Sequence, residues 1–372
     1  MRTTGLAVIC IAVLCITLTL GLWPFHAPRN EVAWLGNHDG LRFGRYSTVF
    51  SSSALQSTSP NGAGGSLDIW LQPGFIWDSN TFLAFYSPKN PVHFSLHQSQ
   101  TDLLLQTAGK DDQYRAKTER LYVSEVFRKS RPVFITITSG TRGTVVYFDG
   151  VPVKNTPQFR LSTKAFTGRI VVGDSPGQTD SWSGQLFGLA IYHQELTGPQ
   201  VFHNYVTWKQ KGRPELTEDE RNVALYFFDE HAGNVVRDEA GSGVDLYIPE
   251  KYTVMNQIFL EPLRTEFSMT RSYWGAAVKN IVGFIPFGFC VYAYMATVLS
   301  IKRATLVTVA LGGAVSLTIE ILQAYLPTRD SGTTDLITNT LGTWIGAVSY
   351  GLLAPTLARI FPGLPFSAPP HQ

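Results

Sequence analysis

Six polar residues near the C-terminal end of the chain have the types and spacing of a polar site at the edge of a membrane. They are Asn280, Glu320, Gln323, Arg329, Asp335 and Asn339. In a helix Glu320 and Gln323 share a face, and so do Asp335 and Asn339 on the next helix. Glu320 lies in an apolar segment, where an ionised carboxylate costs roughly 2.5–3.5 kcal/mol. We therefore expect Glu320 to face other helices and to accept hydrogen bonds from Arg329 or from the nearby amides.

Three interpretations of this set stay open. The polar residues could lock a helical hairpin, or they could bind a polar headgroup at the membrane surface. Glu320 or Asp335 could also act as a general acid or base. The chain contains no HExxH, GxSxG or Walker motif, so an enzyme is the least favoured interpretation and no catalytic residue is assigned.

Four apolar segments could position these residues: 5–24, 276–299, 304–326 and 336–357. Each has close to the ~20 residues needed to cross a bilayer, which predicts a four-span helical bundle. Arg2 before the first segment leaves a signal peptide as the alternative. The best cleavage motif there, Phe25-His26-Ala27, has a bulky first position, which favours an uncleaved anchor. Lys302, Arg303 and Arg359 predict that both termini face the cytoplasm and that residues 30–250 lie outside.

The composition agrees with a mixture of membrane spans and one water-exposed domain. Of 372 residues, 44% are hydrophobic and only 16% are charged, below the ~25% typical of soluble domains. A net charge of +2 gives no reason to expect nucleic acid as a partner. Cys10, Cys15 and Cys290 all lie in apolar segments, so we expect neither disulfides nor metal ligands from them.

Residues 30–250 have the pattern of an all-β domain. Alternating runs at 67–71, 133–137, 145–148, 169–173 and 186–192 predict half-buried strands, and Asp149-Gly150 predicts a hairpin turn. Many short strands separated by turns favour an antiparallel sandwich, interrupted by one helix over residues 198–211. Residues 251–275 are expected to be a linker, and the proline-rich residues 358–372 a disordered tail.

Several segments of this domain resemble the laminin-G and concanavalin A-like family. They are 37–43, 66–73, 145–150, 183–196 and 225–230. The resemblance implies a jelly-roll of two antiparallel sheets that binds glycans or proteins. Hydrolases of this family carry an E-x-D-x-x-E pattern that is absent here, so hydrolysis is not expected.

Tryptophans and two aspartates are the candidate ligand contacts of the sandwich. Trp70, Trp77 and Trp182 could stack on sugar rings, although a role as a core or rim aromatic residue is favoured for each. Asp149 and Asp229 could hold calcium, but turn roles are favoured, and no other cofactor or metal is predicted.

The membrane segments resemble the VanZ-like membrane proteins. The residues that carry this resemblance are NIVGFIPFG at 280–288, EILQ at 320–323, LPTR at 326–329 and DLITNTLG at 335–342. The founding member of that family is associated with low-level teicoplanin resistance. The resemblance implies a four-helix domain of the bacterial plasma membrane, with the sandwich inserted in its first outer loop. It favours a cell-envelope binding or accessory protein, with membrane lipids and a cell-wall precursor, glycan or glycopeptide-like ligand as partners.

Overall fold

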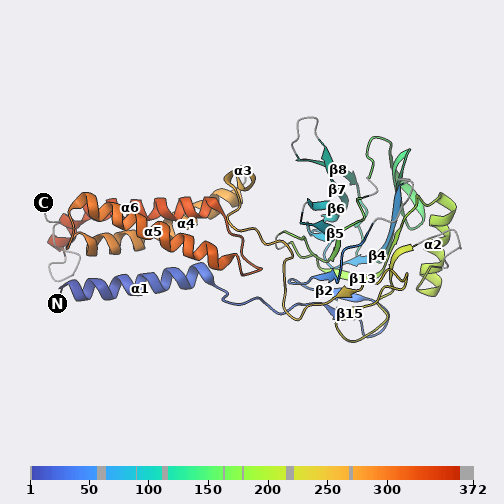
Figure 1. Ribbon diagram of the computed structural model, residues 1–372, viewed down its shortest axis with the longest axis horizontal. Helices are drawn as coiled ribbons and strands as arrows, with labels where there is room; N and C mark the ends of the chain where they lie inside the picture. Colours follow the sequence, from blue (N-terminus) through green and yellow to red (C-terminus); the bar gives the residue numbers. More distant parts are fainter. Residues whose placement is uncertain are drawn as a thin grey trace. The chain divides into compact units, whose positions relative to one another are not determined.

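A computed structural model describes residues 2–56, 64–88, 90–110, 116–161, 164–177, 180–214, 222–267 and 271–360. The chain forms two compact units. One contains Met1–Ala27 together with Gln257–Gln372, and the other contains Pro28–Asn256. The first unit is helical and the second is built mainly of strands (Figure 1). Most of the predicted tail lies outside the described residues.

The strand-rich unit, called the sandwich below, contains two antiparallel sheets. The first sheet has the order β1 (Ala33–Trp34), β2 (Leu41–Phe43), β13 (Gly184–Tyr192), β4 (Gly65–Pro73), β9 (Val133–Gly140), β10 (Gly143–Phe148) and β11 (Val151–Thr156), with β14 (Asn222–Tyr226) also beside β13. The second has the order β15 (Val235–Val236), β16 (Leu246–Tyr247), β3 (Val49–Ser51), β12 (Arg169–Val172), β5 (Thr81–Ser87), β6 (Asn90–Ser99), β7 (Asp102–Lys110) and β8 (Ala116–Val123). Each of the alternating runs found in the sequence forms a strand.

Strand alternation builds the sandwich core. On β4, Leu67, Ile69 and Leu71 are buried and belong to the main apolar cluster, while Trp70 and Gln72 point to the other face. The same cluster contains apolar residues of β5, β6 and β7 from the second sheet, so the core lies between the two sheets. The outer face of the first sheet carries the helix α2 (Gly198–Lys211), which has the predicted bounds (Figure 1).

The helical unit contains four long helices that lie side by side (Figure 1). They are α1 (Arg2–Leu22), α4 (Arg271–Met295), α5 (Ile301–Gln323) and α6 (Thr333–Ile360), with the one-turn helix α3 (Leu263–Glu266) before α4. Among the described residues, three stretches are long and apolar enough to cross a membrane: Thr3–Leu22, Tyr273–Met295 and Ile301–Gln323. The helix α6 is not among them, and its first half contains Asn339 and several threonines.

Small residues let α6 approach both of its neighbours. A Cβ atom at Gly342 or Gly346 would collide with the backbone of α4, at Ile281 and Ile285. The face of α6 that carries Gly342 and Gly346 therefore packs against α4. The contact with α5 lies beside it, where Thr343 fills the space left by Gly312.

Candidate functional site

The Glu320 carboxylate points into the helical unit, where the residue is 1% exposed. Its Oε2 accepts a hydrogen bond from the backbone N–H of Gly332 at 2.9 Å, and the Ser331 hydroxyl is also within hydrogen-bonding reach. Gly332 immediately precedes α6, whose first N–H groups lack partners inside the helix and favour an anion. The expectation for Arg329 differs from the structure, because its guanidinium donates to the carbonyl oxygen of Trp23.

The other predicted residues of the set also pair within the helical unit. The pairs are Gln323 Nε2 with Gly21 O (2.8 Å), Asn339 Nδ2 with Ser316 Oγ (3.0 Å), and the Asn280 side chain with the Asp335 carboxylate. The structure thus brings all six residues to the end of the unit where α5 leads into α6. Each of them is engaged by another helix or by the backbone.

A strap of residues before α4 covers this end of the helical unit. The Gln257 side chain donates to the carbonyl oxygen of Leu326 at 2.5 Å, and the Glu266 carboxylate accepts from the N–H of Thr334 at 2.9 Å. Glu266 therefore serves α6 as Glu320 does, by accepting from the backbone at its start. The sequence assigned residues 251–275 to a linker, and nothing in their pattern predicted these contacts.

The three candidate tryptophans of the sandwich lie in different environments. Trp182 is 1% exposed, packs against Phe43 and Phe82, and donates from Nε1 to Gln98 Oε1 at 2.8 Å. It is a core residue, which agrees with the favoured interpretation and rules out Trp182 as a surface for sugar stacking. Trp77 is 72% exposed. Trp70 is half-buried and lines a cleft beside α2.

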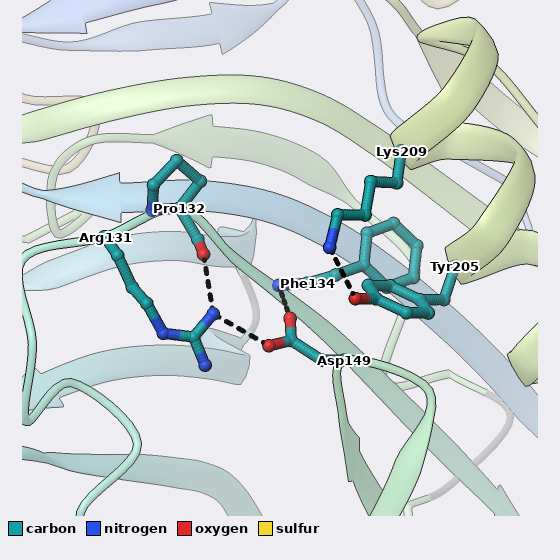
Figure 2. A network of polar contacts seen from close by, with 6 residues as sticks. All are labelled: Arg131, Pro132, Phe134, Asp149, Tyr205 and Lys209. Carbon is teal, nitrogen blue, oxygen red and sulfur yellow. Dashed lines mark hydrogen bonds and ion pairs between the residues drawn. The ribbon is translucent and has the colours of Figure 1, made fainter.

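We call this hollow the α2 cleft. It has a volume of about 290 Å³ and is lined by Trp70, Arg131, Pro132, Phe134, Asp149, Tyr205 and Lys209. Figure 2 shows how its polar groups converge from the first sheet and from α2. An aromatic wall with a few fixed charged and hydroxyl groups is the usual composition of a small-molecule site.

Two features fix α2 against the sheet and so shape the cleft. The buried Asp68 carboxylate on β4 accepts hydrogen bonds from three side chains: Thr136 at 2.5 Å, Tyr192 at 2.8 Å and Asn204 of α2 at 3.1 Å. The Trp208 ring of α2 also occupies the space above Gly188, where any Cβ atom would overlap the ring. These contacts hold Tyr205 and Lys209 over the outer face of the sheet.

Charged groups in the α2 cleft are arranged as one ion pair and one separate cation (Figure 2). Arg131 Nη1 lies 2.9 Å from Asp149 Oδ2, and the other Asp149 oxygen accepts from the Phe134 N–H at 3.1 Å. Lys209 Nζ donates to the Tyr205 hydroxyl at 3.1 Å and lies 5.4 Å from the centre of that ring. Hydrogen bonding to Tyr205, and then the charge interaction with it, raises the pKa of Lys209, which is fully exposed to solvent. Lys209 is therefore a cation available to a ligand.

The candidate calcium ligands do not form a cation site. Asp149 occupies the predicted turn, with φ of 49° followed by 78° at Gly150. Asp229 follows β14 in an irregular segment. Within the described part of the chain, no group of three or more His, Cys, Asp or Glu side chains is placed to hold a metal ion.

Comparison with known families matches two parts of the chain. The VanZ/LLP1 family model matches residues 223–354, and the concanavalin A-like lectin/glucanases superfamily model matches residues 43–202. The chain combines a VanZ-like region with a concanavalin A-like region. Both resemblances seen in the sequence are thereby confirmed. The VanZ-like match begins in β14, so it includes the last strands of the sandwich as well as the helices.

Solved structures similar to the chain include a SAP-like pentraxin from Limulus polyphemus, with 13% identity over 61% of this chain and 95% of that one and a TM-score of 0.35. A putative carbohydrate binding protein from Bacteroides ovatus has 11% identity over 59% and 58% of the two chains, with a TM-score of 0.38. The CBM40 of an IT-sialidase from Ruminococcus gnavus, bound to α2,3 sialyllactose, has 11% identity over 44% and 95%, with a TM-score of 0.33. These likenesses concern the fold alone. A search of curated proteins finds no match.

The sequence pointed to most of the polar residues that pair in the VanZ-like region, but to few of the residues that line the α2 cleft. Arg131, Tyr205 and Lys209 were missed because they come from a loop and a helix with no distinctive motif. The spacing of Tyr205 and Lys209 by one helical turn was the available signal, because it places an aromatic ring and a cation on one face of α2.

Proposed function

We propose that the protein is a membrane-anchored glycan-binding protein whose α2 cleft takes a sugar ring. The observation that carries the proposal is the half-buried Trp70 ring beside the Arg131–Asp149 pair and the Lys209–Tyr205 pair. A sugar ring has an apolar C–H face that stacks on an aromatic ring and hydroxyls that bond to charged side chains. The cleft offers both kinds of surface at the size of a small ligand.

The proposal places the sandwich outside the plasma membrane of a bacterium, where envelope glycans are found. Its support is the pair of cations Lys302 and Arg303 at the start of α5, because short loops rich in Lys and Arg face the cytoplasm. At the other end of the helices, Trp23 and Trp274 are exposed, as aromatic residues are at a membrane interface. In this arrangement α6 is the fourth span, packed along α4 through its glycines.

In this proposal Glu320 and the polar residues around it anchor the start of α6, because the Glu320 carboxylate already accepts a hydrogen bond from Gly332. That engagement favours anchoring over acid–base chemistry at Glu320. A second candidate function, binding the polar headgroup of an envelope precursor, is favoured by two unpaired buried atoms. Gln323 Oε1 and Arg329 Nε are buried and have no hydrogen-bond partner among the residues that the structure describes, and such groups commonly mark a place for a polar ligand or water.

The test is glycan binding by the full-length protein in lipid nanodiscs, first on an array of envelope glycans and then by titration with the best ligand. Trp70→Ala removes the stacking surface, and we expect about a tenfold loss of affinity, or about 1.4 kcal/mol. Lys209→Gln alters only an exposed side chain, so its effect on binding cannot come from misfolding; we expect a smaller loss.

Trp77→Ala is the matched control, because Trp77 is an exposed tryptophan of the same unit that does not line the α2 cleft. It should bind within twofold of the unsubstituted protein. Equal losses at Trp70 and Trp77 would point to a general surface effect. Binding that survives both Trp70→Ala and Lys209→Gln would exclude the α2 cleft as the site.

A further inference from the structure

A second, larger hollow lies on the same outer face of the sandwich as the α2 cleft. We call it the rim hollow. It has a volume of about 800 Å³, and its lining includes Arg42, Gln72, Phe75, Ser130 and Gln185. Three of these residues form one cross-strand row, because Gln185 on β13 pairs in register with Arg42 on β2 and with Gln72 on β4.

The two hollows are neighbours along β4 and along the segment that leads into β9. Gln72 lines the rim hollow and Trp70 lines the α2 cleft, and both project from the same face of β4. Ser130 and Arg131 are likewise consecutive residues that line one hollow each. Gln72 Nε2 also donates to the Ser130 carbonyl oxygen at 3.4 Å, which joins the two walls. We call the two hollows together the outer strip.

The outer strip is longer than one sugar ring. Two strand spacings separate Arg42 from Gln72, and two residues along the strand separate Gln72 from Trp70. With the usual spacing of strands and residues, the straight distance between the backbone positions of Arg42 and Trp70 is roughly 12 Å. The strip therefore offers contacts to several consecutive sugar residues.

Positive charge dominates both ends of the outer strip. Four cations line it, Arg42, Arg45, Arg131 and Lys209, against the two acids Asp78 and Asp149. Asp149 is paired with Arg131. Arg42 makes no hydrogen bond or ion pair with any residue that the structure describes, and Lys209 bonds to a neutral hydroxyl. The cations left for a ligand lie at opposite ends of the strip.

We propose that the outer strip binds a linear acidic glycan, with carboxylate-bearing sugar residues at Arg42 and at Lys209 and the chain stacked on Trp70 between them. This inference rests on the proposed glycan-binding function and specifies its ligand class. In this proposal each cationic end pairs with an acid group of the glycan, and the amide side chains of Gln185 and Gln72 lie between the two ends. Amides bond to sugar hydroxyls as donors and acceptors, while the cations select for acid groups.

The experiment titrates the full-length protein in nanodiscs with galacturonate oligomers of increasing length and with the same oligomers fully methyl-esterified. Esterification removes the charge and keeps the sugar backbone. We expect the acidic hexamer to bind at least about tenfold more tightly than its ester and than the acidic monomer, with affinity that falls as salt rises. Arg42→Gln should weaken hexamer binding severalfold, while Arg237→Gln, at an exposed arginine outside the strip, should leave the affinities for hexamer and monomer unchanged.

Each alternative outcome overturns a stated part of the inference. Equal affinity for acid and ester would overturn the acidic ligand class and leave the proposed function standing. Equal affinity for monomer and hexamer would overturn the outer strip as one binding surface. A polyglutamate peptide that binds as tightly as the hexamer would overturn the choice of a glycan. If no array glycan binds at all, the proposed function itself fails.

Discussion

The helical unit and the sandwich both bury a carboxylate, and they satisfy it with different kinds of donor. Glu320 accepts from the backbone N–H of Gly332, 12 residues along the chain at the start of the next helix. Asp68 accepts from side chains of β9, β13 and α2, which come from distant parts of the sequence. The first carboxylate therefore fixes a local connection between two helices. The second fixes a long-range contact between a helix and a sheet.

The two units also differ in what they leave open to a ligand. The polar residues of the helical unit are covered by neighbouring helices and by the strap at Gln257 and Glu266. The sandwich leaves charged and aromatic groups at the surface of a hollow, next to Trp70. The comparison separates polar groups that hold the fold from polar groups that are available for binding, and substitutions in each unit can test the separation.

The largest effect should come from the contact between α4 and α6. Gly342→Leu places a side chain against the backbone of Ile281, which cannot move aside as a flexible side chain would. Overpacking costs typically 1–3 kcal/mol, and a collision with backbone belongs at the upper end. We expect the full-length protein to be strongly depleted from the membrane fraction, as measured by quantitative immunoblotting.

Gly351→Leu is the matched control for this substitution. Gly351 lies on the same helix, and an added Cβ there would meet no atom within contact distance. The control should accumulate normally. Equal depletion by both leucines would show that the α4 contact is not what α6 depends on.

A smaller but substantial effect is expected at Glu320. Glu320→Ala leaves the buried N–H of Gly332 without its acceptor, which costs about 1–3 kcal/mol. Glu320→Gln keeps an oxygen to accept that bond, so it should restore most of the stability. Thermal unfolding in detergent, followed by intrinsic fluorescence, measures the order unsubstituted > Gln > Ala. If the Glu320→Ala variant unfolds at the same temperature as the Glu320→Gln variant, Glu320 does not anchor α6. That result would favour the headgroup-binding interpretation.

The sequence predicted elements better than it predicted contacts. Strands such as β4 and β9 followed from alternation, and a helix was predicted over residues 198–211, where α2 lies, because such signals are local. Part of the buried face of α5 was also predicted, since Glu320 and Gln323 fall on one side of a helix and are both buried. Local periodicity determines which face is buried.

Partners could not be predicted in the same way, because they depend on how segments distant in sequence meet. Glu320 was expected to accept from Arg329 or from nearby side-chain amides, but it accepts from the backbone N–H of Gly332, which no side-chain pattern reveals. Trp182 was a candidate for sugar stacking, but its ring packs against Phe43 and Phe82 from other strands. The residues of the α2 cleft come from β4, β9, the β10–β11 turn and α2, so only the fold brings them together.

The smallest predicted effect is a pH dependence inside the sandwich. Burial raises the pKa of Asp174 to about 7, although Tyr252, Asp180 and Ser175 all donate hydrogen bonds to its carboxylate. The folded protein thus binds a proton at Asp174 that the unfolded chain, with an ordinary pKa of 3.8, releases earlier. The stability from this group is full below pH 4 and is lost as the pH rises to 7.

His97, whose ring is hydrogen-bonded to the nearby Thr81 hydroxyl, has a pKa shift that affects stability in the opposite direction. Burial, and then the charge of Arg120, lower the pKa of His97 to about 4. Its contribution to stability is present above pH 6.5 and is lost as the pH falls to 4. Because the two groups oppose each other between pH 4 and 6.5, the net profile of the unsubstituted protein should be shallow there. Only a substitution at one of them separates the two contributions.

Asp174→Asn removes the titration and keeps a hydrogen-bonding side chain, since the Tyr252 hydroxyl can accept from the new amide. The melting temperature of the variant relative to the unsubstituted protein should therefore be higher at pH 8 than at pH 5. A change of 1 kcal/mol corresponds to roughly 2–4 °C in a unit of this size. Glu239→Gln, at an exposed carboxylate, should show no such pH-dependent difference. A constant difference for Asp174→Asn across this range would mean that its carboxylate is ionised in the folded sandwich, held by hydroxyl and backbone donors as Glu320 is held by Gly332.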